Sequence, residues 1–259
     1  MENPDNLLIF QAHPSFGNIL ASCSYDGKVL IWREQNGAWQ RIYEYAQHSD
    51  SVNAISWAPV DTGCHLACAS SDGSISIITF ANSTWTSTKH IAHPLGVYGI
   101  SWSPSVGASL YLPTSPTSPT PPAPSKRFVT AGADSTIKIW APSPDIAEPG
   151  YVPVATLVGH QDIVRDVAWA PTLLNKAYIA SASQDKTVRV WTNNAGPGDA
   201  ALDDHTKWKC TVLDFERECW KVSWSLAGNI LAVACGDGRI SLHKENLKGE
   251  WNVVKELEE

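Results

Sequence analysis

Five segments of this 259-residue chain share one pattern, which limits the fold more than any other feature of the sequence. Each begins with apolar and small residues, passes through an aspartate at a turn, and continues as an alternating strand that usually ends on an aromatic residue. The segments are ILASCSYDGKVLIW (19–32), HLACASSDGSISIITF (65–80), RFVTAGADSTIKIW (127–140), YIASASQDKTVRVW (178–191) and ILAVACGDGRISLH (230–243). Internal periodicity of this kind indicates one supersecondary unit repeated along the chain.

Two further motifs accompany the repeated segment. Four copies are preceded by VNAISWAP (52–59), VYGISWSP (97–104), VRDVAWAP (164–171) or CWKVSWS (219–225), and a closing strand such as WQRIYEY or WNVVKEL follows each copy. Each unit therefore offers four short strands with period-two alternation and tight turns. This is the pattern of a β-propeller blade. We predict an all-β propeller with five recognisable four-stranded blades, at about residues 7–45, 52–91, 97–157, 164–213 and 219–257.

Certain polar and aromatic residues recur at fixed places in the repeat. They are the turn aspartates Asp26, Asp72, Asp134, Asp185 and Asp237, the leading histidines His48, His93 and His160, and the strand tryptophans Trp32, Trp140 and Trp191. The aspartate, histidine, serine and tryptophan of one repeat can hydrogen-bond together inside a blade. In the fourth unit these are Asp185, His160, Trp191 and either Ser181 or Ser183. We interpret the set as structural rather than catalytic.

Composition narrows the class of protein. A net charge of −7 argues against a nucleic-acid backbone as the main partner. The longest apolar run, Ile230 to Cys235, is far shorter than the roughly 20 residues of a membrane span, and the N-terminus lacks the features of a secretory signal. We therefore expect a reducing compartment, and we interpret Cys23, Cys68 and Cys235, which lie just before the turn aspartate in three similar segments, as small buried hydrophobic residues.

Three segments read as loops. The stretch SVGASLYLPTSPTSPTPPAPS (105–125) is rich in proline, serine and threonine, so it is predicted to be a disordered surface insert whose Ser-Pro and Thr-Pro pairs offer phosphorylation sites. The segments 141–150 and 193–206 are predicted to be further loops, the second one flexible and acidic.

No constellation of residues indicates an enzyme, a cofactor or a metal. His90 and His93 form an HxxH pair, but His93 is already the repeat histidine. Asp203, Asp204 and His205 are expected to be solvated in their loop, and Glu216, Arg217 and Glu218 to form an exposed turn or a small partner contact. GxSxG, P-loop and GxGxxG motifs are absent from the sequence.

The more particular stretches resemble a known family. GNILASCSYDGKVLIWREQNGAWQRIYEYAQHSDSVNAISWAP, SASQDKTVRVW and WKVSWSLAGNILAVACGDGRISLHKENLKGEW are similar to the small WD-repeat subunit shared by the COPII outer vesicle coat and the Y-shaped scaffold of the nuclear pore. The resemblance covers nearly the whole chain except the proline-rich insert and the 193–206 loop.

The resemblance implies a mode of action. Members of this family form six blades in an open ring, and a partner chain donates a further blade that completes the ring. The implied partners are the rod-forming coat subunit and a helical-solenoid nucleoporin, with a vacuolar nutrient-signalling complex as another possibility. The implied locations are the cytoplasmic face of the endoplasmic reticulum, COPII vesicles in ER-to-Golgi transport, and the nuclear pore. Contact with a membrane is then indirect, through the coat.

This chain differs from the family in its first blade. Its first recognisable unit, LLIFQAHPSFGNILASC, corresponds to the family's second blade, so five blades are present where six are expected; a truncated product, a missed exon or a splice variant would explain this. The candidate partner-blade edge is formed by Leu7, Leu8, Ile9 and Phe10 at one end and by Trp251, Val253, Val254 and Leu257 at the other. These last residues alternatively close their own blade.

Two other functions remain open at the level of sequence. One is a generic WD-repeat adaptor, such as a ubiquitin-ligase substrate receptor, which needs basic or aromatic residues converging on the central channel. The other is an enzymatic propeller, which needs convergent carboxylates or a metal there.

Overall fold

The computed structural model describes residues 9–13, 17–105, 126–143, 150–172 and 176–257, and they form five four-stranded antiparallel sheets. We call these sheets blades 1 to 5. Blade 1 is β1 (Ile9–Ala12), β2 (Ile19–Cys23), β3 (Val29–Gln35) and β4 (Ala38–Tyr45); blade 2 is β5 (Val52–Trp57), β6 (Cys64–Ser70), β7 (Ser74–Ala81) and β8 (Thr84–Ile91). Blade 3 is β9 (Val97–Trp102), β10 (Phe128–Gly132), β11 (Thr136–Pro142) and β12 (Tyr151–Val158); blade 4 is β13 (Val164–Trp169), β14 (Ala177–Ser183), β15 (Thr187–Asn193) and β16 (Lys209–Asp214). Blade 5 is β17 (Cys219–Trp224), β18 (Leu231–Cys235), β19 (Ile240–Glu245) and β20 (Trp251–Leu257).

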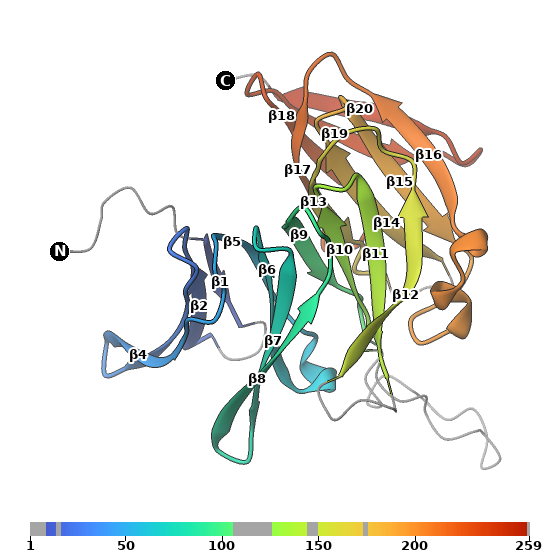
Figure 1. Ribbon diagram of the computed structural model, residues 1–259. Coiled ribbons are helices and arrows are strands. Elements are labelled where there is room, and N and C mark those ends of the chain that lie inside the picture. Colours follow the sequence, from blue (N-terminus) through green and yellow to red (C-terminus); the bar gives the residue numbers. More distant parts are fainter. Residues whose placement is uncertain (1–8, 14–16, 106–125, 144–149, 173–175, 258–259) are drawn as a thin grey trace, which may run out of the picture.

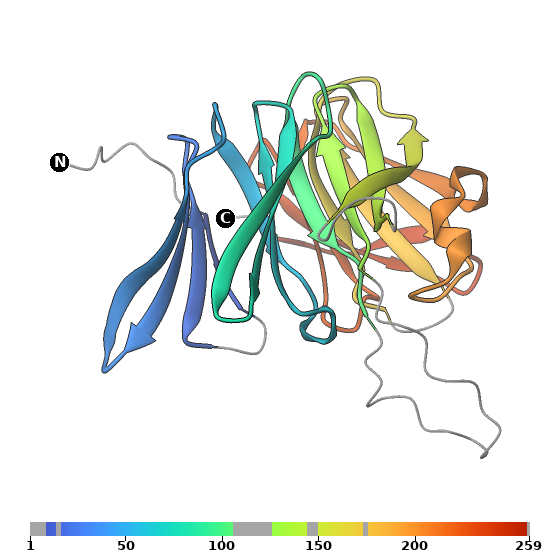
Figure 2. The same ribbon diagram turned by 60° about the horizontal axis from the view of Figure 1, so that its bottom comes forward.

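The blades follow one another around a common centre in chain order. Their first strands, β1, β5, β9, β13 and β17, lie innermost and next to one another, while the fourth strands lie outermost (Figures 1 and 2). Within the described ranges, no strand of blade 5 makes an extensive contact with blade 1. The structure therefore confirms the predicted all-β propeller with an open ring.

The hairpin between the second and third strand of each blade explains the repeated Asp-Gly. Gly73 has a φ of +83°, and a Cβ there would lie 2.6 Å from the carbonyl oxygen of His93. Both the left-handed backbone and the close approach therefore favour glycine. Blade 3 has Ser135 and blade 4 has Lys186 at the same place, with φ of 62° and 66°. The repeated turn is thus retained even where the sequence lacks glycine.

Blades pack face to face, and the alternation of the strands sets which side chains meet. In blade 4, Ala180, Ala182, Val188 and Val190 point toward blade 5 and form one core with its Val222 and other apolar residues. Because successive side chains of a strand lie on opposite faces, the intervening residues of β14 and β15 point toward blade 3. Blades 2 to 4 are thus each covered on one side by the preceding blade and on the other by the next.

The tryptophans that end the inner strands link neighbouring blades through hydrogen bonds as well as packing. The indole nitrogen of Trp57 donates to the carbonyl oxygen of Gln11 at 3.0 Å, and that of Trp102 donates to the carbonyl oxygen of Ser56 at 2.8 Å. Trp224 makes the corresponding bond to the Ala168 carbonyl at 3.0 Å. These bonds join successive innermost strands, so these tryptophans fix how each blade sits against the one before it.

The interpretation of the 193–206 loop as flexible, with solvated Asp203, is wrong. The segment contains two short 3-10 helices, η3 (Ala200–Asp203) and η4 (His205–Lys207), and Leu202 is 1% exposed. The Asp203 carboxylate accepts hydrogen bonds from Nε and Nη2 of Arg127 at 2.6 and 2.7 Å. Asp204 accepts from the Thr206 backbone N–H. Of the proline-rich insert, only Ser105 lies within the described residues, and most of the 141–150 loop lies outside them.

Replacing an inner-strand tryptophan should loosen the joint between two blades. We expect Trp102→Phe to lower the free energy of unfolding by about 1–3 kcal/mol, since it removes the hydrogen bond to the partly buried Ser56 carbonyl and opens a small cavity. Chemical denaturation monitored by circular dichroism gives this value. The matched control is Trp39→Phe, because Trp39 is 47% exposed; an equal cost for both variants would show that the inter-blade bond contributes nothing.

Candidate protein-docking surface

Blades 3 and 4 each contain a polar network that ties the turn to the centre of the sheet. In blade 4, His160 Nδ1 lies 2.9 Å from the Asp185 carboxylate and His160 Nε2 lies 2.8 Å from Ser181 Oγ, to which the Trp191 indole donates at 3.1 Å. The structure thus brings together the predicted set with Ser181, while Ser183 bonds to backbone groups instead.

The network of blade 3 uses His93, Asp134, Trp140 and Thr130. His93 Nδ1 lies 2.8 Å from Asp134 Oδ1, and its Nε2 lies 2.8 Å from Thr130 Oγ1, which also accepts from the Trp140 indole at 3.0 Å. Each of these four side chains makes a hydrogen bond to another member of the set. These residues are therefore arranged to hold the blade together.

The other blades carry partial versions of the network. In blade 2, Cys68 stands where blade 4 has its serine, and His48 Nε2 instead meets Ser76 Oγ at 2.9 Å while Nδ1 faces Asp72 at 3.0 Å. In blade 1, Trp32 donates to Ser22 Oγ at 2.9 Å. Asp26 accepts from the nearby Lys28 backbone N–H.

Burial sets the protonation of these pairs. Desolvation lowers the pKa of His48, His93 and His160 below the ordinary value, against the opposing pull of their aspartates. A neutral imidazole with its proton on Nδ1 donates to the carboxylate and leaves Nε2 to accept from the hydroxyl. Burial alone would raise the pKa of Asp185, but hydrogen bonds from Thr187, Gln161 and His160 lower it to about 2. The aspartates are therefore ionised acceptors at neutral pH.

Blade 5 has one face that no other blade covers. Its side chains Ala232, Ala234, Ile240 and Leu242 occupy the same register positions as Ala180, Ala182, Val188 and Val190 of blade 4. In blades 1 to 4, none of the side chains at these positions is more than 1% exposed. In blade 5 the two alanines and Leu242 are only half-buried and Ile240 is 39% exposed. We call these four residues, with Leu257 opposite Ile240 on β20, the open face.

At this end of the chain the structure supports the alternative interpretation, in which the last strand closes its own blade. Trp251 does not face the opening, because its ring lies 5.9 Å from that of Tyr178 and 5.6 Å from that of Trp224 and packs on the core between blades 4 and 5. Val253 pairs with His243 on that same side, and Val254 is the extra residue of a β-bulge. Only Leu257 of the four predicted residues lies on the open face, where it is 40% exposed.

At the other end of the ring, blade 1 also has a side without a covering blade. Leu20, Leu30 and Trp32 lie on it and are half-buried. Of the predicted N-terminal edge, Leu7 and Leu8 lie outside the described residues. Ile9 and Phe10 belong to β1, whose backbone pairs with β2.

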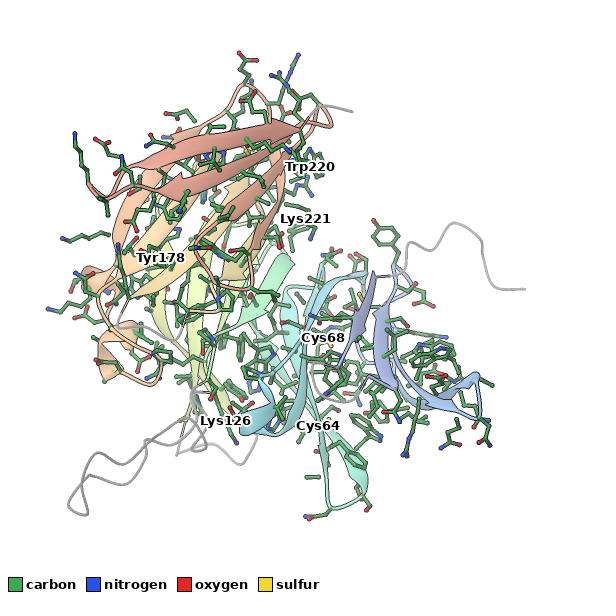
Figure 3. The ribbon with its side chains drawn as sticks, turned by 180° about the vertical axis from the view of Figure 1, so that it is seen from behind. Cys64, Cys68, Lys126, Tyr178, Trp220 and Lys221 are labelled. Carbon is green, nitrogen blue, oxygen red and sulfur yellow. The ribbon has the colours of Figure 1, made fainter. Side chains whose placement is uncertain are left out.

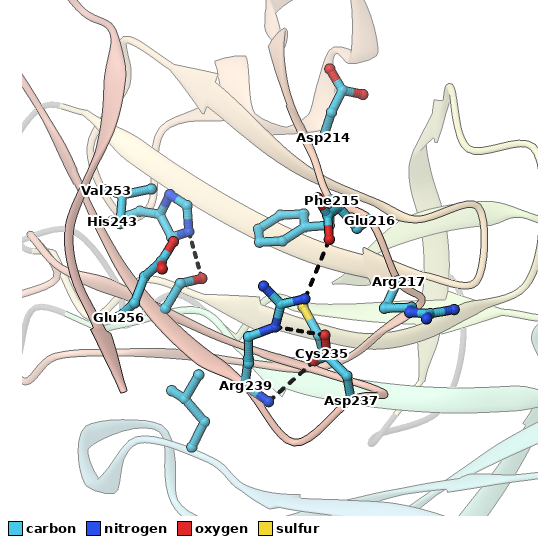
Figure 4. A pocket seen from close by; sticks show the side chains of 12 residues that line it. Asp214, Phe215, Glu216, Arg217, Cys235, Asp237, Arg239, His243, Val253 and Glu256 are labelled. Carbon is cyan, nitrogen blue, oxygen red and sulfur yellow. Dashed lines mark hydrogen bonds and ion pairs between the residues drawn. The ribbon is translucent and has the colours of Figure 1, made fainter. Parts of the chain in front are cut away.

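Blade 5 lacks the polar network and has a small cavity of about 230 Å³ in its place (Figure 4). His243 stands at the position of the strand tryptophan, and its Nε2 meets Ser241 Oγ at 2.8 Å. Arg239 crosses the cavity to Asp237 and Glu216 at 2.8 and 3.3 Å. Arg217 also lines this cavity, and with Glu216 it is exposed in the bend between β16 and β17, in agreement with the predicted exposed turn.

The recurring cysteines differ in their burial. Cys23 and Cys68 are 1% and 0% exposed, as the repeat predicts. Cys235 is only half-buried, which corrects the expectation, because it borders the cavity of blade 5. Burial raises the pKa of the Cys68 thiol strongly. A thiol so far from its thiolate form is a poor nucleophile.

The remaining sequence candidates do not converge on a reaction centre. His93 is fully buried against Asp134, whereas the neighbouring His90 contacts Tyr151 with ring centroids 6.4 Å apart. In the described part of the chain there is no group of three or more metal-ligating side chains. Among those same residues, no helix is long and apolar enough to cross a membrane.

Comparison with known proteins gives consistent matches. The model of the "WD domain, G-beta repeat" family matches residues 151–192, and that of the "Anaphase-promoting complex subunit 4 WD40 domain" matches residues 15–105. The chain is 50% identical to "Protein transport protein sec13" of Emericella nidulans, covering 96% of this chain and 79% of the relative. It is 42% identical to "Protein transport protein SEC13" of Mycosarcoma maydis, covering 95% and 78% respectively.

Acid should weaken the fold through the buried histidines and aspartates. Their folded pKa values lie below the ordinary ones, so the unfolded chain takes up protons first and stability falls as the pH drops below about 6.5, and again near pH 4. We expect the unfolding midpoint in urea to decrease steadily from pH 7 to pH 4.

Two variants distinguish the contribution of a buried network histidine to this pH dependence from that of an exposed histidine. His160→Gln should flatten the decrease between pH 7 and pH 5, because glutamine does not titrate, whereas His205→Gln, on an exposed residue, should leave the profile unchanged. A midpoint that is constant or rises on acidification would contradict this account.

Proposed function

Because this chain belongs to the Sec13 family of WD-repeat protein transport proteins, we propose that it is a non-enzymatic scaffold whose open ring accepts a blade from a partner protein. The observation that carries the proposal is the open face of blade 5. Ile240 and Leu242 stand where every other blade buries its side chains under a neighbour. A sheet that packs there removes this apolar surface from water in the way that blade 5 covers blade 4.

The chemistry of the open face favours a β-sheet as the occupant. Ala232 and Ala234 are small, so a facing sheet can approach closely, and Ile240, Leu242 and Leu257 supply the larger side chains that interdigitate with it. The pattern is that of a sheet interior rather than of a groove for a helix. A blade of alternating apolar residues donated by another chain matches this surface, as in the family that the sequence resembles.

The partners follow from the family. The relatives are protein transport proteins by name, which supports a role of this chain in protein transport as part of a vesicle coat. We take the rod-forming subunit of the COPII outer coat as the donor in transport from the endoplasmic reticulum to the Golgi. A helical-solenoid nucleoporin takes the same place when the chain serves in the nuclear pore scaffold.

A structural role also agrees with how the polar residues are used. The histidines and aspartates that resemble a catalytic set, such as His160 and Asp185, are held in closed networks inside the blades. Rigid blades joined by such networks present a fixed surface, and a rigid surface loses little entropy when a partner docks.

A charge on the open face should prevent docking without unfolding the protein. We expect Ile240→Asp to reduce recovery of the donor by at least tenfold in affinity purification from cell extract with quantitative mass spectrometry, since a desolvated carboxylate opposes sheet packing. The variant should keep the unfolding midpoint of the parent, because Ile240 is 39% exposed in the free chain.

Ile91→Asp is the matched control, since Ile91 is 88% exposed on the outer strand of blade 2. It should retain the donor. Recovery of the coat rod subunit and of nucleoporins in separate fractions would distinguish the two complexes. Undiminished recovery of both with Ile240→Asp would overturn the proposed docking surface.

A further inference from the structure

One mouth of the central channel is a cavity of about 500 Å³ to which all five blades contribute. The second residue of four consecutive inner strands lines it: Asn53 on β5, Tyr98 on β9, Arg165 on β13 and Trp220 on β17. Tyr25, from the β2–β3 turn of blade 1, completes the wall. A volume of this size is typical of sites that bind ligands or peptide side chains.

Arg165 is held in a fixed position inside this mouth. Its Cζ lies 5.0 Å from the ring centroid of Tyr98 and 5.0 Å from that of Trp220, so the guanidinium makes a cation–π contact with both rings. With its amide oxygen turned toward Arg165, Gln184 accepts from Nη2 at 2.5 Å and from Nε at 3.2 Å. Among the described residues, no carboxylate forms an ion pair with this guanidinium. Its charge is therefore oriented but not neutralised.

The surroundings of Arg165 are basic and aromatic, although the whole chain carries a net charge of −7. Lys221 follows Trp220 on β17; its side chain is 60% exposed and lies 3.4 Å from the buried Asp166. Trp220 is 45% exposed and Tyr25 is 53% exposed. Figure 3 shows Trp220 and Lys221 on the side of blade 5 that faces the centre of the ring.

We propose that this mouth binds an acidic peptide segment of a partner protein. A carboxylate side chain of the peptide bonds to the free edge of the Arg165 guanidinium, since arginine matches a carboxylate in a bidentate geometry. Apolar side chains of the same peptide pack on the exposed rings of Trp220 and Tyr25, which are the residue types that dominate binding energy at interfaces.

Two observations favour a peptide over a nucleic acid. The mouth offers Arg165 and Lys221 as its cations, whereas binding along a phosphate backbone depends on many neutralised phosphates. The net charge of −7 also repels a long polyanion more strongly than a short peptide that carries a few carboxylates. This inference goes beyond the proposed function, because the mouth lies at the inner strands and shares no residue with the open face of blade 5.

Binding is tested by fluorescence anisotropy with the full chain. The probes are a fluorescein-labelled eight-residue peptide of alternating glutamate and leucine, and its counterpart with lysine in place of glutamate. We expect the acidic peptide to bind in a salt-dependent manner. Arg165→Gln should weaken it about tenfold or more. Arg33→Gln removes the same charge from an exposed position on β3 of blade 1 and should leave the affinity unchanged.

A second variant and a second readout keep the test decisive. Trp220→Leu should also weaken the acidic peptide severalfold, and the unfolding midpoint shows whether either variant has lost its fold. Ile240→Asp should bind the peptide as the parent does, so failure of the docking proposal and failure of this one are separable. Equal loss with Arg165→Gln and Arg33→Gln, equal binding of the lysine peptide, or tighter binding of oligouridine RNA than of the acidic peptide would overturn the inference.

Discussion

Packing of one blade face on the next is the interaction on which the rest of this structure depends. A four-stranded sheet with apolar residues on both faces is not stable alone in water, so each blade requires a neighbour on either side. Ala180 and Val190 of blade 4 meet this need under blade 5, and their equivalents in blades 1 to 3 do so under the following blade. The inner tryptophans, such as Trp102, add directional bonds that fix the position of each blade. An open ring must then leave an uncovered face at its end.

The polar networks act within single blades rather than between them. His160 and Asp185 connect the hairpin turn of a blade to its central strand, and burial keeps the histidine neutral and the aspartate ionised. The network is complete in blades 3 and 4 and reduced toward both ends of the ring. In blade 5, His243 replaces the tryptophan and a cavity crossed by Arg239 replaces the network. The regular blades are thus specialised for stability, whereas blade 5 departs from the repeat next to the surface that we propose to bind a partner.

Much of this fold followed from the repeat, and the errors have a common cause. The all-β class, the four-strand unit and the turn aspartates follow from local spacing, which a sequence displays directly. The order of the 193–206 segment was missed because it depends on Arg127, which is distant in the chain and binds Asp203. Trp251 was assigned to the opening because its strand is the last, yet its ring packs toward blade 4. The side on which a residue lies depends on register and bulges, as the displaced Val254 shows.

The residues of the open face can be identified by aligning the repeats, although the predicted edge did not include most of them. Ala232 and Ala234 align with Ala180 and Ala182, so the repeat already marks them as residues that a neighbouring blade should cover. The sequence by itself determined that five similar sheets form and which of their residues require burial, since alternation and turn chemistry are local properties. Only the tertiary structure decided which of those residues stay uncovered, and that Tyr98, Arg165 and Trp220 meet at one mouth of the channel, because both depend on how sheets distant in the chain pack around a common centre.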